Sequence, residues 1–148
     1  MVDGRRQWIA DQQQRMAERP RTRWRDGDTC ACLGEPLTLR VRAAARAKVT
    51  RHGRELWVQV ADSEDEAMVS HAVHEWWRAL ARETFQHSIE RQFAWFADRG
   101  HALPVLRVKK MRSRWGSLSR RGYINLSLAL MQYPLTVIDY VVMHELCH

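Results

Sequence analysis

Three residues at the carboxyl end of the 148-residue chain have the types and spacing of a hydrolytic metal site: His144, Glu145 and His148, within HELCH. Residues four apart on an α-helix lie about 40° apart around its axis, so both imidazoles can reach one metal ion. Glu145 lies one step round, where its carboxylate can contact a metal-bound water without being a ligand. We therefore predict that His144 and His148 bind Zn²⁺ and that Glu145 is the general base.

The residues before this motif favour a helix that points it into apolar surroundings. The run 134–143 begins with proline, which a first helical turn tolerates, and is otherwise mostly apolar. An apolar stripe at the spacing i, i+4, i+7 and i+11 continues into the motif through Val137, Val141, His144 and His148. Buried imidazoles and a carboxylate need partners, which a metal ion would provide. The alternative is a surface helix end with two unrelated histidines.

Two other sets of metal-binding residue types are weaker candidates. His71 and His74 are three residues apart, but the sequence supplies no further ligands near them. Cys30 and Cys32 form a tight pair without a partner pair, and three cysteines do not indicate a disulfide framework. We interpret the two histidines as ordinary residues of a helix surface, and the cysteine pair alone is a weak indication of a metal site.

Length and composition indicate one globular domain, residues 1–148, because a chain with 45% hydrophobic residues can bury a core of its own. The charged amino terminus leads into no signal-like apolar stretch, and no apolar run is long enough to span a membrane. We expect a soluble cytoplasmic protein with no membrane partner. The sequence gives no indication of the oligomeric state.

The net charge of +7 is unevenly distributed. Residues 37–54 contain six basic and no acidic side chains, and residues 107–121 contain seven basic and none acidic. Such stretches could bind the phosphates of a nucleic acid. Arginine outnumbers lysine by 21 to 3, however, so coding bias is an alternative explanation of the charge.

The first third of the chain predicts a short helix followed by a small antiparallel sheet. The helix covers residues 5–18. Alternating or β-branched stretches predict strands at 37–42, 47–51 and 55–60, the last two forming a hairpin about His52 and Gly53. Residues 26–28 and 33–36 have the composition of turns.

A long helix and a second set of strands follow. Ser63, with Glu66 three residues on, predicts a helix start, and the helical pattern runs to about Asp98. The pattern weakens at 82–87, so the span could be two helices. The remaining expected elements are a strand at 105–108, a polar turn at 112–119, a strand at 122–127 and the motif helix. The fold class is therefore α+β.

The segment RSRWGSLSRRGYINLSLALMQYPLTVIDYVVMHELCH, residues 112–148, resembles the YgjP-like metallopeptidases, bacterial relatives of the SprT group. It has a similar R-W-G-S turn, a strand and a proline-containing entry to a helix with H-E-L-x-H. Upstream positions that also resemble the family are Trp8-Ile9, Asp26-Gly27, Leu33-Gly34 and His74-x-x-Trp77. Two positions differ from common family residues: Leu118, where cysteine is frequent, and Ser127, where asparagine is frequent.

The resemblance implies a zincin-like fold and peptide-bond hydrolysis by a zinc-bound water, with a peptide or protein as substrate. It also implies a third histidine ligand after residue 148, so we expect residues 1–148 to be carboxy-terminally incomplete, to bind zinc weakly and to be inactive. By analogy with zincins, a substrate strand would dock along residues 123–127. Arg114 is a candidate contact for the substrate or the transition state.

Two other functions remain open at this point. One is a nucleic-acid-associated protein, either a peptidase that acts on DNA-bound proteins, as the SprT relationship suggests, or a basic binding module. The other is a non-catalytic relic of the family. DNA binding that persists after Glu145→Gln would support the first alternative.

Overall fold

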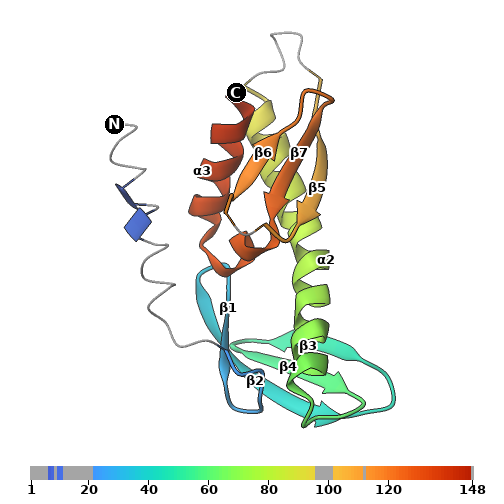
Figure 1. The fold of residues 1–148 in the computed structure, drawn as a ribbon. Coiled ribbons are helices and arrows are strands. Elements are labelled where there is room, and N and C mark those ends of the chain that lie inside the picture. The colour runs from blue at the N-terminus through green and yellow to red at the C-terminus, as the bar shows by residue number, and fades with distance from the viewer. Residues whose placement is uncertain (1–6, 9, 12–21, 96–101, 112, 148) are drawn as a thin grey trace.

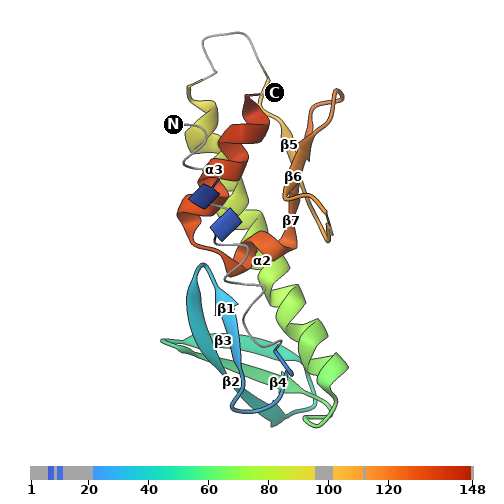
Figure 2. The ribbon, with the colours of Figure 1, turned by 60° about the vertical axis from the view of Figure 1, so that its left-hand side comes forward.

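The computed structural model describes residues 7, 8, 10, 11, 22–95, 102–111 and 113–147. Residues 7, 8, 10 and 11 are helical, and the remainder of the helix predicted for 5–18 lies outside the described residues. The fold is α+β, as predicted. Two small sheets lie toward opposite ends of one long helix, and the motif helix runs beside the half of that helix that carries the second sheet (Figures 1 and 2).

The first sheet contains β1 (Thr29–Cys32), β2 (Glu35–Ala43), β3 (Lys48–His52) and β4 (Glu55–Val60) in the order β1-β2-β4-β3. The hairpins β1–β2 and β3–β4 are antiparallel, but β2 and β4 are parallel. The prediction of an antiparallel sheet was therefore wrong. After β2 the chain enters the edge strand β3, and the β3–β4 hairpin then returns so that β4 lies between β2 and β3. The side chains of Leu56, Val58 and Val60 in β4 are fully buried.

Strand β1 was not predicted, because its four residues lie between two stretches with turn composition. Leu33 and Gly34 form the turn between β1 and β2, and both have positive φ, 50° and 84°. The backbone N–H groups of this turn donate to the carbonyl oxygens of Met131 and Gln132, at 2.7 and 3.1 Å. The first hairpin thus contacts the segment that leads into the motif helix.

Helix α2 (Glu66–Phe93) is continuous, so the division into two helices that the weak pattern at 82–87 suggested does not occur. Its N-cap is Asp65 and not Ser63: the Asp65 carboxylate accepts a hydrogen bond from the backbone N–H of Met68, at 3.2 Å. An aspartate at this position satisfies one of the free N–H groups of the first turn, as the predicted serine would have done.

The buried side of α2 winds around the helix. Its main buried side chains recur at every fourth position: Val69, Val73, Trp77, Ala81, Phe85 and Ile89. Each step of four residues advances by about 40° around the axis, so the six positions turn through roughly 200°. One helix can therefore bury opposite sides at its two ends, one against β3 and β4 and the other against the motif helix.

The second sheet contains β5 (Val105–Lys109), β6 (Gly116–Leu118) and β7 (Tyr123–Ser127) in the order β5-β7-β6. Strand β5 is parallel to β7, and β6 is antiparallel to it. The strands predicted near 105–108 and 122–127 are confirmed. Strand β6 falls within the predicted polar turn at 112–119. Strand β7 is central and paired on both sides, so the prediction that residues 123–127 form a docking edge was wrong.

A 3₁₀ helix, η2 (Leu128–Gln132), and the motif helix α3 (Leu135–Leu146) complete the described chain. Pro134 is the N-cap of α3, which agrees with the helix entry predicted from sequence. Val137, Ile138, Val141 and Val142 are its buried residues. No helix in the described part of the chain is both long enough and apolar enough to cross a membrane.

Candidate metal centre

His144 lies in the last turn of α3, with its side chain exposed to solvent. The ring of Tyr140, one helical turn earlier, is nearly parallel to the imidazole: the planes differ by 17° and the ring centroids are 6.3 Å apart. The expectation that the histidine continues a buried stripe was wrong at this position, because the stripe leaves the core between Val141 and His144. An exposed imidazole that packs against a tyrosine is accessible to a metal ion.

Glu145 is half-buried and lies against strand β6. A Cβ atom added to Gly116 would be 3.3 Å from the Glu145 Cγ atom, and 3.0 Å from both the Asn125 carbonyl oxygen and the Leu126 Cδ2 atom. The glycine therefore permits a close approach between strand and helix that a larger residue would prevent. The glycine of the R-W-G-S segment is thus explained by packing against the general base predicted from sequence.

The start of β6 is fixed by its neighbours on both sides. The Trp115 carbonyl oxygen accepts a hydrogen bond from the Ser127 N–H at 2.9 Å. The Trp115 ring packs against Tyr133, with 4.7 Å between the ring centroids, just before α3 begins. These contacts join the start of β6 to the last residue of β7 and to the residue before Pro134, the N-cap of α3.

A polar contact also joins α3 to α2. The hydroxyl of Ser88, which is fully buried, donates to the Asp139 Oδ1 atom at 2.5 Å, and the Arg91 guanidinium donates to the same oxygen at 2.7 Å. Asp139 lies five residues before His144, so this contact sets the position of the motif helix. The prediction from sequence did not include it, although Asp139 is the one charged residue of the mostly apolar run 134–143 and so is a detectable signal.

The remaining predicted site residues are not brought together by the described structure. His148 lies outside the described residues. Arg114 is exposed in the segment before β6, and its side chain has no described contact with Glu145. Across 7, 8, 10, 11, 22–95, 102–111 and 113–147, no group of three His, Cys, Asp or Glu side chains is placed to hold a metal ion. A metal at His144 therefore needs donors from outside these residues.

Among the weaker candidates for metal binding, His74, Cys30 and Cys32 have packing roles, whereas His71 is exposed. His74 lies between Trp24 and Trp77, with ring centroids 5.4 and 5.1 Å away, and its Nδ1 atom is 2.7 Å from the Ser70 carbonyl oxygen. Cys30 and Cys32 are buried in the core, and burial raises the pKa of both thiols, that of Cys30 to about 12. Burial therefore favours the neutral thiol over the thiolate, the form that binds metals.

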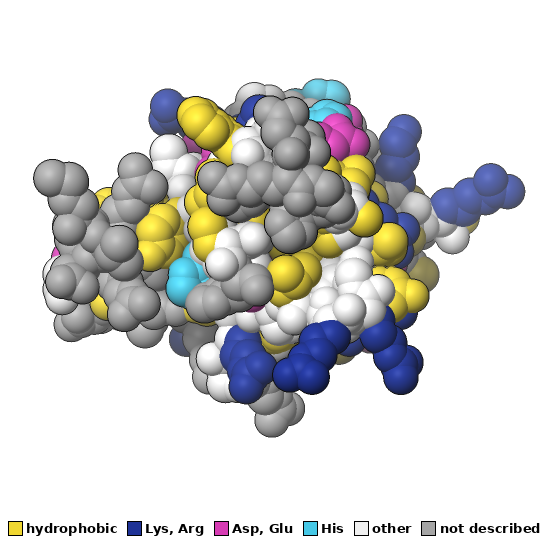
Figure 3. All heavy atoms as spheres, turned by 90° about the horizontal axis from the view of Figure 1, so that it is seen from above, with side chains coloured by type: hydrophobic (Ala, Val, Ile, Leu, Met, Phe, Trp, Pro, Cys, Tyr) yellow, Lys and Arg dark blue, Asp and Glu magenta, His cyan; other side chains and the backbone are white. Residues whose placement is uncertain are grey.

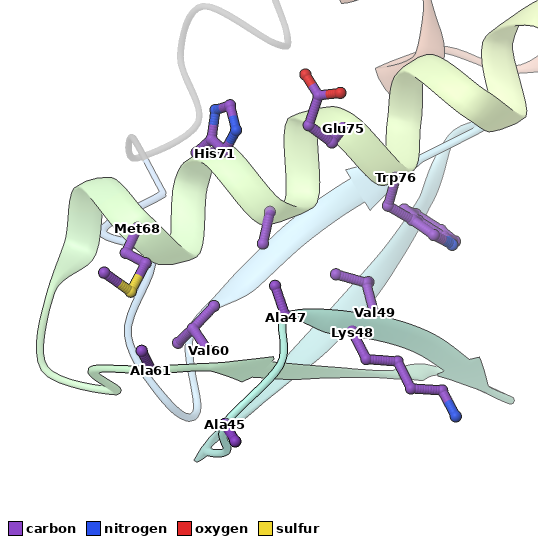
Figure 4. A pocket seen from close by; sticks show the side chains of 11 residues that line it. Ala45, Ala47, Lys48, Val49, Val60, Ala61, Met68, His71, Glu75 and Trp76 are labelled. Atoms are coloured by element: carbon purple, nitrogen blue, oxygen red, sulfur yellow. The ribbon is translucent and has the colours of Figure 1, made fainter.

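A pocket of about 480 Å³ lies far from α3, between the first half of α2 and strands β3 and β4 (Figure 4). Met68, Val49 and Trp76 line its apolar interior. Figure 4 shows His71 and Glu75 on the side of the helix that faces away from the strands. The lining of the pocket is thus mainly apolar.

These features define an α+β protein with a histidine–glutamate pair in the last turn of a helix beside an edge strand. Comparison with protein families identifies the whole chain, residues 1–148, as a match to the YgjP-like metallopeptidase domain. The chain belongs to this family, which confirms the resemblance noted in the sequence. Neither the curated proteins nor the solved structures contain a match to the chain.

Proposed function

We propose that this protein is a zinc-dependent metallopeptidase in which Glu145 is the general base. Membership of a metallopeptidase family supports the activity class. The observation that carries the assignment to these residues is the position of Glu145: it follows the exposed His144 on α3 and lies over Gly116 of an edge strand. A carboxylate held beside a strand edge is suited to act on a peptide bound along that strand.

His144 and His148 are the proposed zinc ligands, through neutral imidazole nitrogens. Their donor chemistry fits zinc, and His144 is exposed where a metal could bind. When bound, zinc supplies a Lewis acid that polarises the substrate carbonyl and makes a water nucleophile available near neutral pH. The Glu145 carboxylate accepts the proton of the attacking water and returns it to the leaving amine nitrogen.

A third protein ligand is normal for catalytic zinc, and we propose that it too lies outside the described residues. With His144 and His148 as the only protein ligands, zinc would be held weakly and hydrolysis would be slow. We further propose that α3 and the second sheet form a zincin-like arrangement. In it β6, and not residues 123–127, is the strand along which the substrate docks. A substrate in extended conformation would pair with the free edge of β6.

Arg114 stays a candidate substrate contact, because it lies two residues before β6 and is exposed. Its replacement by alanine is expected to raise the KM of an extended peptide more than it lowers kcat. Unchanged values of both would remove Arg114 from the site.

The test separates metal binding from chemistry. Zinc affinity is measured by competition with a chromophoric chelator, and hydrolysis with a fluorogenic casein. His144→Ala is expected to weaken zinc binding by at least tenfold, since one of few ligands is lost, whereas His71→Ala, at another exposed histidine, leaves it unchanged. Glu145→Gln is expected to keep zinc and lose hydrolysis.

Two outcomes would contradict the proposal. Zinc affinity that is the same in wild type, His144→Ala and His71→Ala would exclude α3 as the metal site. The second outcome is stoichiometric zinc binding at His144 without hydrolysis, both in this chain and in a version that carries a histidine-containing segment after residue 148. It would support a non-catalytic relic of the family.

A further inference from the structure

The positive charge of the protein is concentrated in one part of the fold. Residues 22–95 contain eleven Lys and Arg and eleven Asp and Glu, so this part of the chain is formally neutral. Residues 102–147 contain seven Lys and Arg but only two Asp and Glu, and no acidic residue occurs between Asp98 and Asp139. The net charge of +7 therefore arises mainly from the segment that forms the second sheet and α3.

Ion pairing increases this contrast. Six cations of residues 22–95 pair with described carboxylates, for example Arg40 with Glu55 and Arg42 with Asp26. Within 102–111 and 113–147, by contrast, no cation forms an ion pair with a described carboxylate; these cations are Arg107, Lys109, Lys110, Arg114, Arg120 and Arg121. The second sheet thus has a positive electrostatic potential that no described carboxylate neutralises through an ion pair.

Several of these side chains share the face of the second sheet that points away from α2 and α3. Ile124 and Leu126 of the central strand are buried on the inner face, so their neighbours Tyr123 and Asn125 lie on the outer face. Strand register places Arg107 of β5 and Ser117 of β6 on either side of Asn125. Figure 3, a view onto this end of the molecule, shows Lys and Arg side chains projecting along one side.

The outer face, defined by Arg107, Lys109, Ser117, Tyr123 and Asn125, combines phosphate-binding groups with a stacking surface. Arg107 and Lys109 are exposed and two residues apart on one strand, or about 7 Å. The Arg107 guanidinium carbon lies 3.5 Å from the centroid of the Tyr123 ring. A planar guanidinium stacked on a ring offers its other side to a nucleobase.

We propose that the outer face of the second sheet binds single-stranded nucleic acid, separately from the peptidase site. The unpaired cations contact successive phosphates, and the Arg107–Tyr123 stack supports a base. An acidic polypeptide would satisfy the cations but would make no use of the stack. Arg107 and Lys109 lie on β5, at the sheet edge opposite β6, so the central strand β7 separates them from a substrate paired with β6.

Fluorescence anisotropy with a labelled oligothymidylate of twelve nucleotides, in the presence of a metal chelator, tests this proposal independently of peptidase activity. The affinity is expected to fall with salt, with a log–log slope of about −2 to −3 for three to four phosphates. Polyglutamate of matched charge is expected to bind at least about tenfold more weakly, because base stacking contributes about 1–3 kcal/mol per base.

Matched variants separate the outer face from net charge. Arg107→Glu/Lys109→Glu and Arg46→Glu/Arg54→Glu change the charge equally, and neither pair makes a described ion pair. The first double variant is expected to weaken oligothymidylate binding at least tenfold and the second less than threefold, whereas Tyr123→Leu weakens it several-fold without a charge change. Circular dichroism verifies that each variant folds.

Equal losses in the two double variants would overturn the proposal, since they would indicate a general field effect. Polyglutamate that binds as tightly as the oligonucleotide would overturn it in favour of an acidic polypeptide. An affinity for wild type that does not change with salt would also overturn it, and this measurement needs no variant.

Discussion

Ser88 of α2 donates a hydrogen bond to Asp139 of α3, with 2.5 Å between the Ser88 Oγ and Asp139 Oδ1 atoms. The serine is fully buried, and Arg91 donates to the same carboxylate oxygen. This directional contact adds to the apolar packing that holds the helix with His144 and Glu145 against α2. The site proposed at the end of α3 therefore depends on a polar contact one and a half turns earlier.

Loss of this contact is expected to destabilise the protein. Asp139→Ala leaves the buried Ser88 hydroxyl without its acceptor, which should cost about 1–3 kcal/mol in the free energy of unfolding. Urea denaturation measures the change, and Glu83→Ala, at an exposed acid of α2 outside the described ion pairs, is the control. The control should differ from wild type by less than about 0.5 kcal/mol. An Asp139→Ala variant as stable as this control would show that apolar packing suffices to position α3.

Gly116 is expected to tolerate no side chain. In Gly116→Ala the new Cβ would lie 3.0 Å from the Asn125 carbonyl oxygen, which is backbone and cannot move aside cheaply. Strand β6 should shift away from α3, with a cost of about 1–3 kcal/mol and a loss of hydrolysis that depends on Glu145.

Gly53→Ala is the comparison for this change. Its φ of +61° makes alanine strained, but no atom lies within 4 Å of the added Cβ. It should lose about 1–2 kcal/mol of stability and keep full hydrolysis. If both variants lost hydrolysis in proportion to stability, the contact between Gly116 and Glu145 would have no specific role.

The elements with a clear periodic pattern could be predicted from the sequence. The hairpin about Gly53, the long helix, the two strands of the second sheet and the motif helix all follow from local patterns of apolar residues. The site prediction rested on the spacing of His144, Glu145 and His148, and the last turn of α3 carries the first two, while His148 lies outside the described residues. The metal-binding role of His144 and His148 stays a prediction.

What the sequence could not provide is pairing between distant segments. The parallel pairing of β2 with β4 depends on which strand the hairpin inserts, and nothing local to either strand encodes it. Strand β6 has only three residues, too few for a period, and its identity follows from its pairing with β7. The buried positions of α2 repeat every four residues, so the buried side shifts around the helix axis along its length. The apolar pattern therefore looked interrupted, and the sequence suggested two helices where the structure has one.

The three cysteines are expected to differ in reactivity. Cys147 is exposed, whereas Cys30 and Cys32 are buried and their pKa values are raised. At pH 8, iodoacetamide should modify one cysteine in the folded protein and three in urea, as counted by mass spectrometry. Rapid modification of Cys30 or Cys32 in the folded protein would contradict the burial of β1.

The same burial predicts a loss of stability in alkali. Burial, followed by the neighbouring Cys32, raises the pKa of Cys30 from 9.0 to about 12, so the folded state favours the neutral thiol. This contribution is fully present below about pH 9 and is lost as the pH rises toward 12. Urea denaturation from pH 8 to 11 should show the decline, and Cys30→Ala should reduce it. An equal decline in the variant would assign the effect to other groups.

Tyr140 is expected to orient the His144 ring for metal binding. The two rings differ by 17° in plane with centroids 6.3 Å apart, a separation at which aromatic pairs contribute about 0.5–1.5 kcal/mol. Tyr140→Ala should therefore weaken zinc affinity by roughly two- to tenfold, measured by chelator competition, because the imidazole loses this ring contact and more of its motion must be ordered when zinc binds. Tyr140→Phe retains the ring and should bind zinc as wild type does. If the phenylalanine variant lost as much affinity as the alanine variant, the hydroxyl and not the ring contact would be the feature of Tyr140 that matters for zinc.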